Sequence, residues 1–172
     1  MEIEIRRTTA VGLLGGFVLI YLAAVGYAAS PRDAAGHPLL LLPEVRAVEN
    51  YRQLALGWDS AWRNLDQTIS GVLHSDKTQL LAASQHAQSS IDTAASLAGQ
   101  VDAADAPAAL IGLKDLTNQT ATDYSAASTA AARWLSAPSS ANLTAATAAL
   151  TKARADRKQL EANAWLTTGA SR

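Results

Sequence analysis

An apolar residue recurs between Val48 and Val72 at alternating intervals of three and four positions. A helix with this spacing presents one continuous apolar seam along its length, as the helices of coiled coils do. The spacing therefore predicts a long helix that packs lengthwise against other helices. At 1.5 Å per residue, a helix of about 30 residues is ~45 Å long. The residues of the seam are Val48, Tyr51, Ala55, Trp58, Trp62, Leu65, Ile69 and Val72.

The composition favours the same all-α class. Hydrophobic residues make up 49% of the 172 residues, and Ala is the largest contributor, whereas aromatic residues make up only 5%. Ala is the best helix former and is depleted in strands. With so much Ala, we expect Trp58, Trp62, Trp134 and Trp165 to supply much of the stability, because a buried Ala gains little.

Breaks near residues 74–77, 99–107 and 137–139 divide the chain after Pro43 into four helical segments. We expect Ser75 or Asp76, then Asp105, then Ser139 or Ser140, to cap the later helices. Short turns between long helices predict an antiparallel up-down-up-down four-helix bundle over residues 44–172. The expected seams are Leu80, Ser84, Ala87, Ile91, Ala94, Ala98 and Val101 in the second segment; Leu110, Leu113, Thr117, Thr120, Tyr124, Ala127, Ala131 and Trp134 in the third; and Leu143, Ala146, Leu150, Ala153, Arg157, Leu160, Ala164 and Thr167 in the fourth.

Residues 8–30 contain no charge over 23 positions. A membrane-spanning helix needs about 20 residues, whereas the apolar core of a secretory signal has about 7–15. The length predicts a retained signal anchor at 8–30, after a cytoplasmic N-terminus at 1–7 and before a linker at 31–43. The alternative is a signal peptide cleaved after Ala28, which would release a secreted helical protein.

Arg6 and Arg7 directly precede the predicted span. Because Arg and Lys gather on the cytoplasmic side, we expect the N-terminus inside and the bundle on the extracytoplasmic side. The Ala-rich usage is typical of a bacterial chain, so the expected location is the bacterial cytoplasmic membrane. Gly12 and Gly16 form a G-x-x-x-G pair within the span. Such a pair lets a second membrane helix approach closely, although Gly is also common in spans that lack a partner.

Arg157 occupies a seam position of the fourth segment, where an apolar residue is expected. Antiparallel threading places it level with Trp58 and Thr120, with Asp59 or Asp123 available as a carboxylate partner. These residues predict a polar layer within the bundle, in which the guanidinium lies over the indole. The alternative is an Arg whose stem packs in the seam while its charged group reaches water.

The sequence carries no catalytic signature, and we expect a non-enzymatic protein without cofactor or metal. Cys is absent, and the three His residues are scattered at 37, 74 and 86 without the Glu-x-x-His pattern of di-iron bundles. A net charge of −1 leaves no basic face for nucleic acid. The expected partners are membrane lipid and other subunits of a membrane complex.

These features predict an accessory or scaffold subunit of a larger membrane or cell-envelope complex. One alternative is an extracytoplasmic ligand-sensing or solute-binding bundle that acts through a partner. The order of span and bundle resembles the outer sensory region of chemoreceptor-type proteins, which would imply ligand sensing. Ala61-Trp62 with Leu65-Asp66 resembles LemA-type membrane-anchored helical proteins, although the basic and Pro-Asn-Leu stretch of that family is missing. We assign the chain to neither family.

Overall fold

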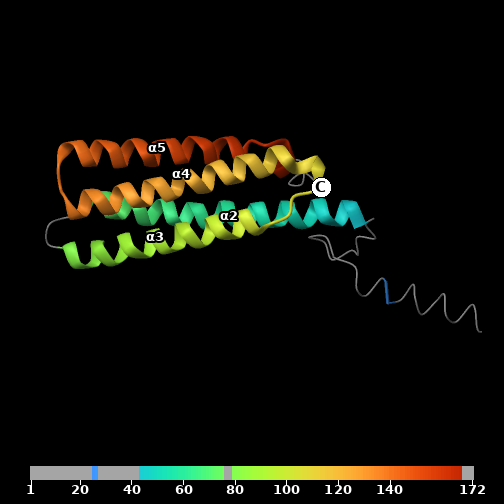
Figure 1. Cartoon of the computed structure of the whole chain (residues 1–172), viewed down its shortest axis with the longest axis horizontal. Helices are drawn as coiled ribbons and strands as arrows, with labels where there is room; N and C mark the ends of the chain where they lie inside the picture. Colours follow the sequence, from blue (N-terminus) through green and yellow to red (C-terminus); the bar gives the residue numbers. More distant parts are fainter. Residues whose placement is uncertain (1–24, 27–42, 76–78, 168–172) are drawn as a thin grey trace, which may run out of the picture. The chain divides into compact units, whose positions relative to one another are not determined.

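The computed structural model describes residues 25–26, 43–75 and 79–167, and its regular structure there is entirely helical. This confirms the all-α class. The elements are α2 (Pro43–Leu73), α3 (Leu80–Ala103), the 3-10 helix η2 (Ala108–Leu110), α4 (Ile111–Ser136), α5 (Ser140–Glu161) and the short α6 (Ala164–Thr167) (Figure 1).

The chain divides into two compact units, residues 1–46 and residues 47–172. In the first unit, Val25 and Gly26 are helical. The rest of the predicted span, including Gly12 and Gly16, lies outside the described residues. Among the helices that the structure describes, none combines the length and the apolar character needed to cross a membrane.

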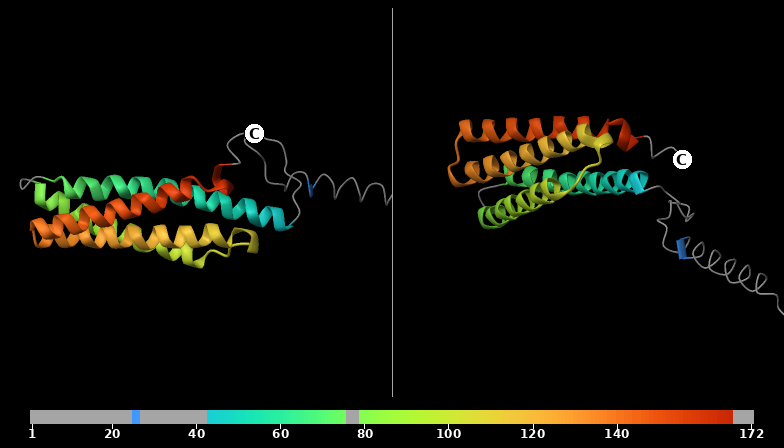
Figure 2. Two further views of the ribbon diagram at one scale, coloured as in Figure 1. Left: turned by 90° about the horizontal axis from the view of Figure 1, so that it is seen from above. Right: turned by 45° about the vertical axis from the view of Figure 1, so that its right-hand side comes forward.

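The long helices lie side by side in a bundle, and contacting residues give their directions. On α2 and α5 the partners change in opposite order, since Asp59 pairs with Arg157 and Asp66 pairs with Arg154. These two helices are therefore antiparallel, as Figure 2 shows. Figure 1 shows α4 and α5 running in opposite directions on either side of the turn at residues 137–139.

The predicted seam of α2 is confirmed, because all of its members are buried except Val48, which is half-buried. The large ring of Trp62 is fully buried and stacks parallel to the ring of Tyr124 on α4, with centroids 6.3 Å apart. Trp58 is also buried and meets Tyr51 edge-on at 5.8 Å. The aromatic residues of α2 thus fill the middle of the bundle.

The predicted seam of α4 is confirmed from Leu110 to Ala131, with Trp134 half-buried. The seam of α5 is right in its centre and wrong at both ends. Leu143 is exposed in the first turn, and Ala164 is exposed beyond the end of α5. Because α5 ends at Glu161, the chain changes direction and α6 buries Leu166 instead.

The predicted seam of α3 is wrong by one position at several places. The buried residues are Ala83, Ala87, Ser90, Ala94, Leu97 and Val101, which keep the three-four spacing. Ser90 replaces Ile91 in the interior, and it can be buried because its hydroxyl donates to the Ala87 carbonyl at 2.8 Å. Ile91 remains half-buried on the neighbouring flank.

Two predicted helix caps are also wrong. The N-cap residue of α3 is Gln79, and Ser75 instead donates to the Val72 carbonyl at the end of α2. Asp105 does not cap α4, because η2 begins after Pro107 and leads directly into the helix. The cap of α5 is confirmed, since the Ser139 hydroxyl accepts a hydrogen bond from the Asn142 backbone N–H at 3.1 Å.

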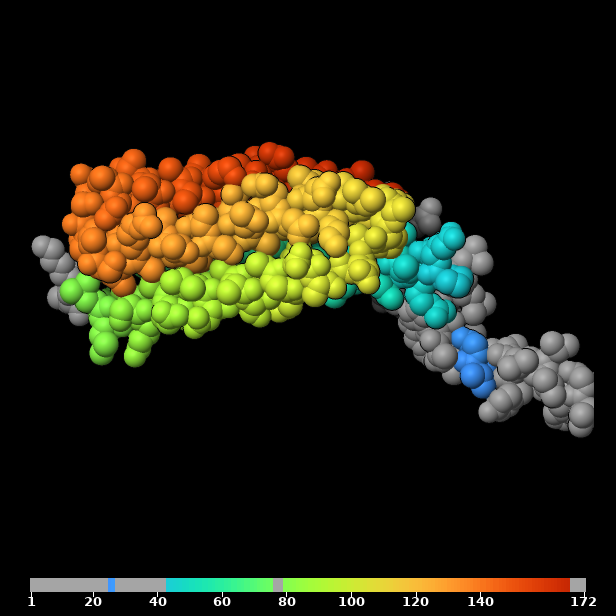
Figure 3. Space-filling view, in the orientation of Figure 1, coloured from blue at the N-terminus to red at the C-terminus, as the bar shows by residue number. Residues whose placement is uncertain are grey.

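Small residues allow α4 to approach α3 and α5 closely. Ala127 of α4 and Ala146 and Ala153 of α5 are fully buried, and α4 lies close to both α3 and α5. The space-filling view shows α4 lying directly against α3 along its length (Figure 3). Trp165 departs from expectation, because 44% of its surface is exposed and it contributes little to this core.

Candidate functional site

Most of the charged residues of α2 lie on one flank of its buried seam. Arg52, Asp59, Arg63 and Asp66 each stand one position after a seam residue. Because one step along a helix turns the side chain by about 100°, these residues share one flank. That flank faces α5, which supplies charges of its own.

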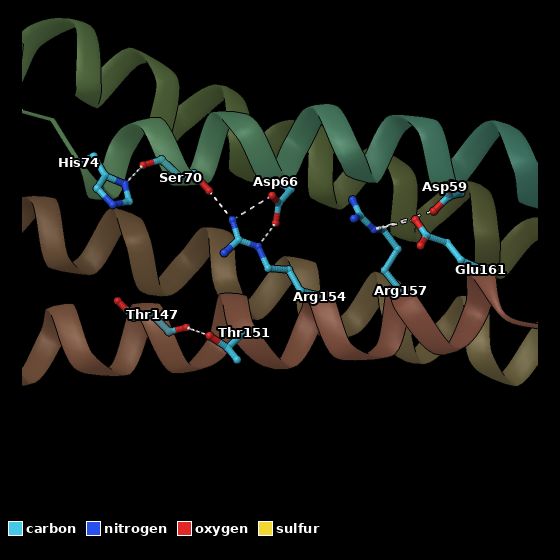
Figure 4. Close-up of polar contacts among 9 residues, drawn as sticks. All are labelled: Asp59, Asp66, Ser70, His74, Thr147, Thr151, Arg154, Arg157 and Glu161. Carbon is cyan, nitrogen blue, oxygen red and sulfur yellow. Dashed lines mark hydrogen bonds and ion pairs between the residues drawn. The ribbon is translucent and has the colours of Figure 1, made fainter.

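An ion-pair cluster lies between α2 and α5, and its first part joins Asp59 and Arg63 of α2 to Arg157 and Glu161 of α5. Figure 4 shows Arg157 between Asp59 and Glu161. Arg63 lies 2.6 Å from Asp59 and 3.1 Å from Glu161. Arg157 Nε lies 3.4 Å from Glu161 and 3.9 Å from Asp59, beyond the usual ~2.7–3.2 Å of a hydrogen bond. Two cations therefore face two carboxylates where α2 and α5 meet.

The second part of the cluster is a bidentate pair nearer the other end of the seam. Arg154 Nε and Nη2 donate to the two oxygens of Asp66 at 2.7 and 3.0 Å. Arg154 also donates to the Ser70 hydroxyl at 2.7 Å. Such forked contacts fix geometry better than single ones, so this pair is consistent with one register of α5 on α2. Sequence reasoning did not single out these residues.

The predicted polar layer is only partly assembled. Arg157 does reach Asp59, the neighbour of Trp58, and its side chain is 20% exposed, so it is mostly buried rather than extended into water. Trp58 makes its ring contact with Tyr51. Thr120 is buried but donates to the Leu116 carbonyl of its own helix at 2.8 Å. The three residues thus have three different partners.

Asp123 of α4, the other proposed partner of Arg157, pairs with Lys152 of α5 instead, at 2.5 Å. Burial by itself would raise the pKa of Asp123. Hydrogen bonds with Asp156, Lys152 and Gln119 outweigh that effect and hold the pKa below its ordinary value. The pKa of Asp156 is raised, because it shares a hydrogen bond with the Asp123 carboxylate and is partly desolvated.

Asp59 behaves in the opposite way. Burial raises its pKa, and the nearby Glu161 carboxylate raises it further, while Arg63 and Arg157 oppose the shift without cancelling it. The ionised form of Asp59 is therefore disfavoured by folding, whereas that of Asp123 is favoured.

These shifts predict opposite pH dependences for two matched variants. The raised pKa of Asp59 costs stability as the pH rises above the ordinary value of about 3.9, so D59N should gain stability relative to wild type as the pH rises through that window. The lowered pKa of Asp123 adds stability that is lost as the pH falls through its folded pKa, so D123N should lose ground relative to wild type as the pH rises to about 5. Thermal melts of both variants from pH 2.5 to 7 test this. Two curves that move in the same direction would contradict it.

A second group of polar atoms is buried between α2 and α4. The Trp62 indole nitrogen and the hydroxyls of Tyr124 and Ser128 have no hydrogen-bond partner among the described residues. Burial raises the pKa of Tyr124 to about 12, so this phenol stays protonated at neutral pH. The group is suited to structure or to bound water rather than to proton abstraction.

The remaining charged groups offer no metal centre in the part of the chain described. No cluster of three or more His, Asp or Glu side chains lies there in a geometry that could hold a metal ion. The ring of His74 contacts the Ser70 carbonyl at 2.7 Å, His86 is exposed on α3, and His37 lies outside the described residues.

Two surfaces with little or no charge lie elsewhere on the bundle. A hollow of about 710 Å³ lies on the outward face of α5, between Leu143 and Ala155, and Lys152 is its one charged lining residue. Between α2 and α3 lie two adjoining hollows of about 530 and 210 Å³, and no charged residue lines either. Such surfaces are places where another macromolecule can bind without burying an unpaired charge.

Comparison with protein-family models, with curated proteins and with solved structures finds no match. The fold and the site therefore define only a structural class, which is an all-α helical bundle with ion pairs between α2 and α5.

Proposed function

We propose that this chain is a non-catalytic accessory or scaffold subunit of a larger membrane or cell-envelope complex. Residues 8–30 would form a retained signal anchor in the bacterial cytoplasmic membrane, with Gly12 and Gly16 on its packing face. Beyond it, α2 to α5 would form an antiparallel up-down-up-down four-helix bundle on the extracytoplasmic side, which binds the partner.

The outward face of α5 carries this proposal. Its first three turns expose Leu143, Thr144, Thr147 and Ala148 without a charge. Side chains of this size let a second helix approach closely, and they lose little conformational entropy when a partner covers them. Lys152 lies further along this face and is already paired with Asp123, so a partner need not neutralise the charge of Lys152.

The ion-pair cluster supports the scaffold role in a different way. Its cations and carboxylates are paired with one another across α2 and α5, which fits a rigid support better than a reaction centre. A rigid bundle presents the α5 face in one geometry and so lowers the entropic cost of binding.

A photo-crosslinking amino acid at Ala148 of the full-length chain tests the proposal in its native membrane. We expect covalent products with one or a few other membrane proteins, identified by mass spectrometry after detergent extraction. The matched control is the same amino acid at Gln85, which is exposed on α3. Products no more abundant from position 148 than from position 85 would overturn the assignment of this face.

A further inference from the structure

Five buried polar atoms of α2, α4 and α5 have no hydrogen-bond partner in the described part of the chain. Three of them belong to Trp62, Tyr124 and Ser128, which are buried between α2 and α4. The other two are Asp59 Oδ1 and Arg157 Nε of the ion-pair cluster. Such atoms are rare in folded proteins, because a buried donor or acceptor without a partner destabilises the fold. A partner from outside the chain is therefore expected at one or more of them.

The contact between Asp59 and Arg157 is too long to satisfy either side chain. Arg157 Nε lies 3.9 Å from Asp59 Oδ1 and 3.4 Å from Glu161, so neither contact is an ordinary hydrogen bond. The nitrogen is a donor and the oxygen is an acceptor, and both atoms are shielded from solvent. Polar atoms more than about 3.5 Å apart are commonly bridged by a water molecule, which accepts from the first and donates to the second.

The hydroxyl of Tyr124 approaches the same contact from α4. Its ring stacks on that of Trp62, which stands three residues after Asp59 on α2, or about one helical turn. Burial has the largest effect on the pKa of the Tyr124 phenol and raises it, and among the charged groups Arg157 has the largest influence. Asp59 and the second part of the ion-pair cluster influence the phenol as well. The hydroxyl therefore lies close to the contact between α2 and α5.

The second ion pair on the same two helices provides a contrast. Arg154 Nε donates directly to Asp66 at 2.7 Å, and Arg154 Nη2 donates to the second carboxylate oxygen at 3.0 Å. Arg154 and Asp66 thus satisfy each other, whereas Arg157 Nε and Asp59 Oδ1 do not. Two pairs of the same residue types therefore differ in whether a third molecule is needed to complete their hydrogen bonds.

We propose that one ordered water molecule is bound inside the bundle among Asp59, Arg157 and Tyr124. The water accepts from Arg157 Nε and from the Tyr124 hydroxyl, and it donates to Asp59 Oδ1. A buried water typically makes about three hydrogen bonds, so these partners are sufficient to hold it. The water joins α4 to the ion pair between α2 and α5, and so links three helices. This internal site does not depend on the α5 face, so either proposal can fail without the other.

NMR spectroscopy of the whole chain in detergent tests this site in solution. Magnetisation transfer from water to the isotope-labelled arginine Nε–H groups reports a bound water, and a rotating-frame experiment separates it by sign from proton exchange. We expect the cross-peak of Arg157 Nε–H to be at least threefold stronger than that of Arg154 Nε–H, which donates directly to a carboxylate. Cross-peaks of equal strength, or none at Arg157, would overturn the proposal.

Two variants of α4 form a matched pair for the same measurement. Y124F removes one partner of the water and keeps the stacked ring, so the Arg157 cross-peak should fall at least threefold. T120V removes a buried hydroxyl four residues earlier, which already donates to the Leu116 carbonyl, so the cross-peak should be unchanged. If the two variants gave the same result, the Tyr124 hydroxyl would not be a partner of the water.

A crystal structure of the whole chain gives an independent measurement of the site. We expect electron density for a water molecule within about 2.5–3.2 Å of Arg157 Nε, Asp59 Oδ1 and the Tyr124 hydroxyl. A site without that density, or a direct hydrogen bond from Tyr124 to Asp59 in its place, would contradict the account.

Discussion

W62A should lower the melting temperature of this protein by about 10 °C or more. Trp62 is fully buried in the middle of α2, and its ring stacks on Tyr124 of α4. Replacing a core Trp by Ala typically costs about 3–5 kcal/mol, because buried surface is lost and a cavity remains. Total stabilities are about 5–15 kcal/mol, so the variant should be largely unfolded at moderate denaturant concentrations. Far-UV circular dichroism during thermal or urea unfolding measures the effect.

The neighbouring Tyr124 supplies the matched control. Y124F keeps the stacked ring and removes a hydroxyl that has no partner among the described residues, so its melting temperature should change little or rise. A shift of only a degree or two for W62A would mean that the aromatic centre does not carry the core.

A153L should also destabilise the fold, by overfilling rather than emptying the interior. Ala153 is fully buried on α5, which lies close to α4. A larger side chain at that position forces the helices apart or into strained rotamers, at a typical cost of about 1–3 kcal/mol. We expect a melting temperature lower by several degrees, measured by the same circular dichroism assay.

A155L is the control for that substitution. Ala155 lies two residues further along α5 but on its exposed outward face. The same change should alter stability there by no more than about 0.5 kcal/mol. If the two variants melted alike, Ala153 would not be a point of close helix contact.

The apolar pattern predicted the buried positions of a helix well only where the side chains that form the pattern are large. In α2 the seam could be predicted almost completely, because Trp, Tyr, Leu and Ile mark one face unambiguously. In α3 Ala, Ser and Gln occur on every face, so the choice between Ser90 and Ile91 favoured the wrong one. The hydroxyl of Ser90 donates a hydrogen bond within its own helix, so burying it costs little free energy. A hydrophobicity pattern does not register this, because it counts Ser as polar.

The ends of the helices were less predictable than their centres. Ser139 was recognised because a Ser directly before a helix has one strong use, capping. The exposed Ala164 and the buried Leu166 could not be foreseen, since the end of α5 at Glu161 carries no Pro or Gly. The local signal at this turn is Asn163, whose side-chain oxygen accepts from the Trp165 backbone N–H at 3.0 Å at the start of α6.

The site was found only in part for a geometric reason. Arg157 was recognisable because a charge interrupts an apolar seam, and one of its two suggested carboxylate partners, Asp59, was right. Arg154 and Asp66 lie on flanks, and which flanks meet depends on the rotation of each helix about its own axis. That rotation is set by the packing of the whole bundle, so the bidentate pair required the structure.

The mass of the intact protein purified from its native membrane tests most directly whether the bundle works as a tethered subunit. If residues 8–30 remain as an anchor, the protein should be found in the membrane fraction with the full mass of about 17.9 kDa. A mature chain that begins at Ala29 and is recovered without detergent would contradict the proposed function.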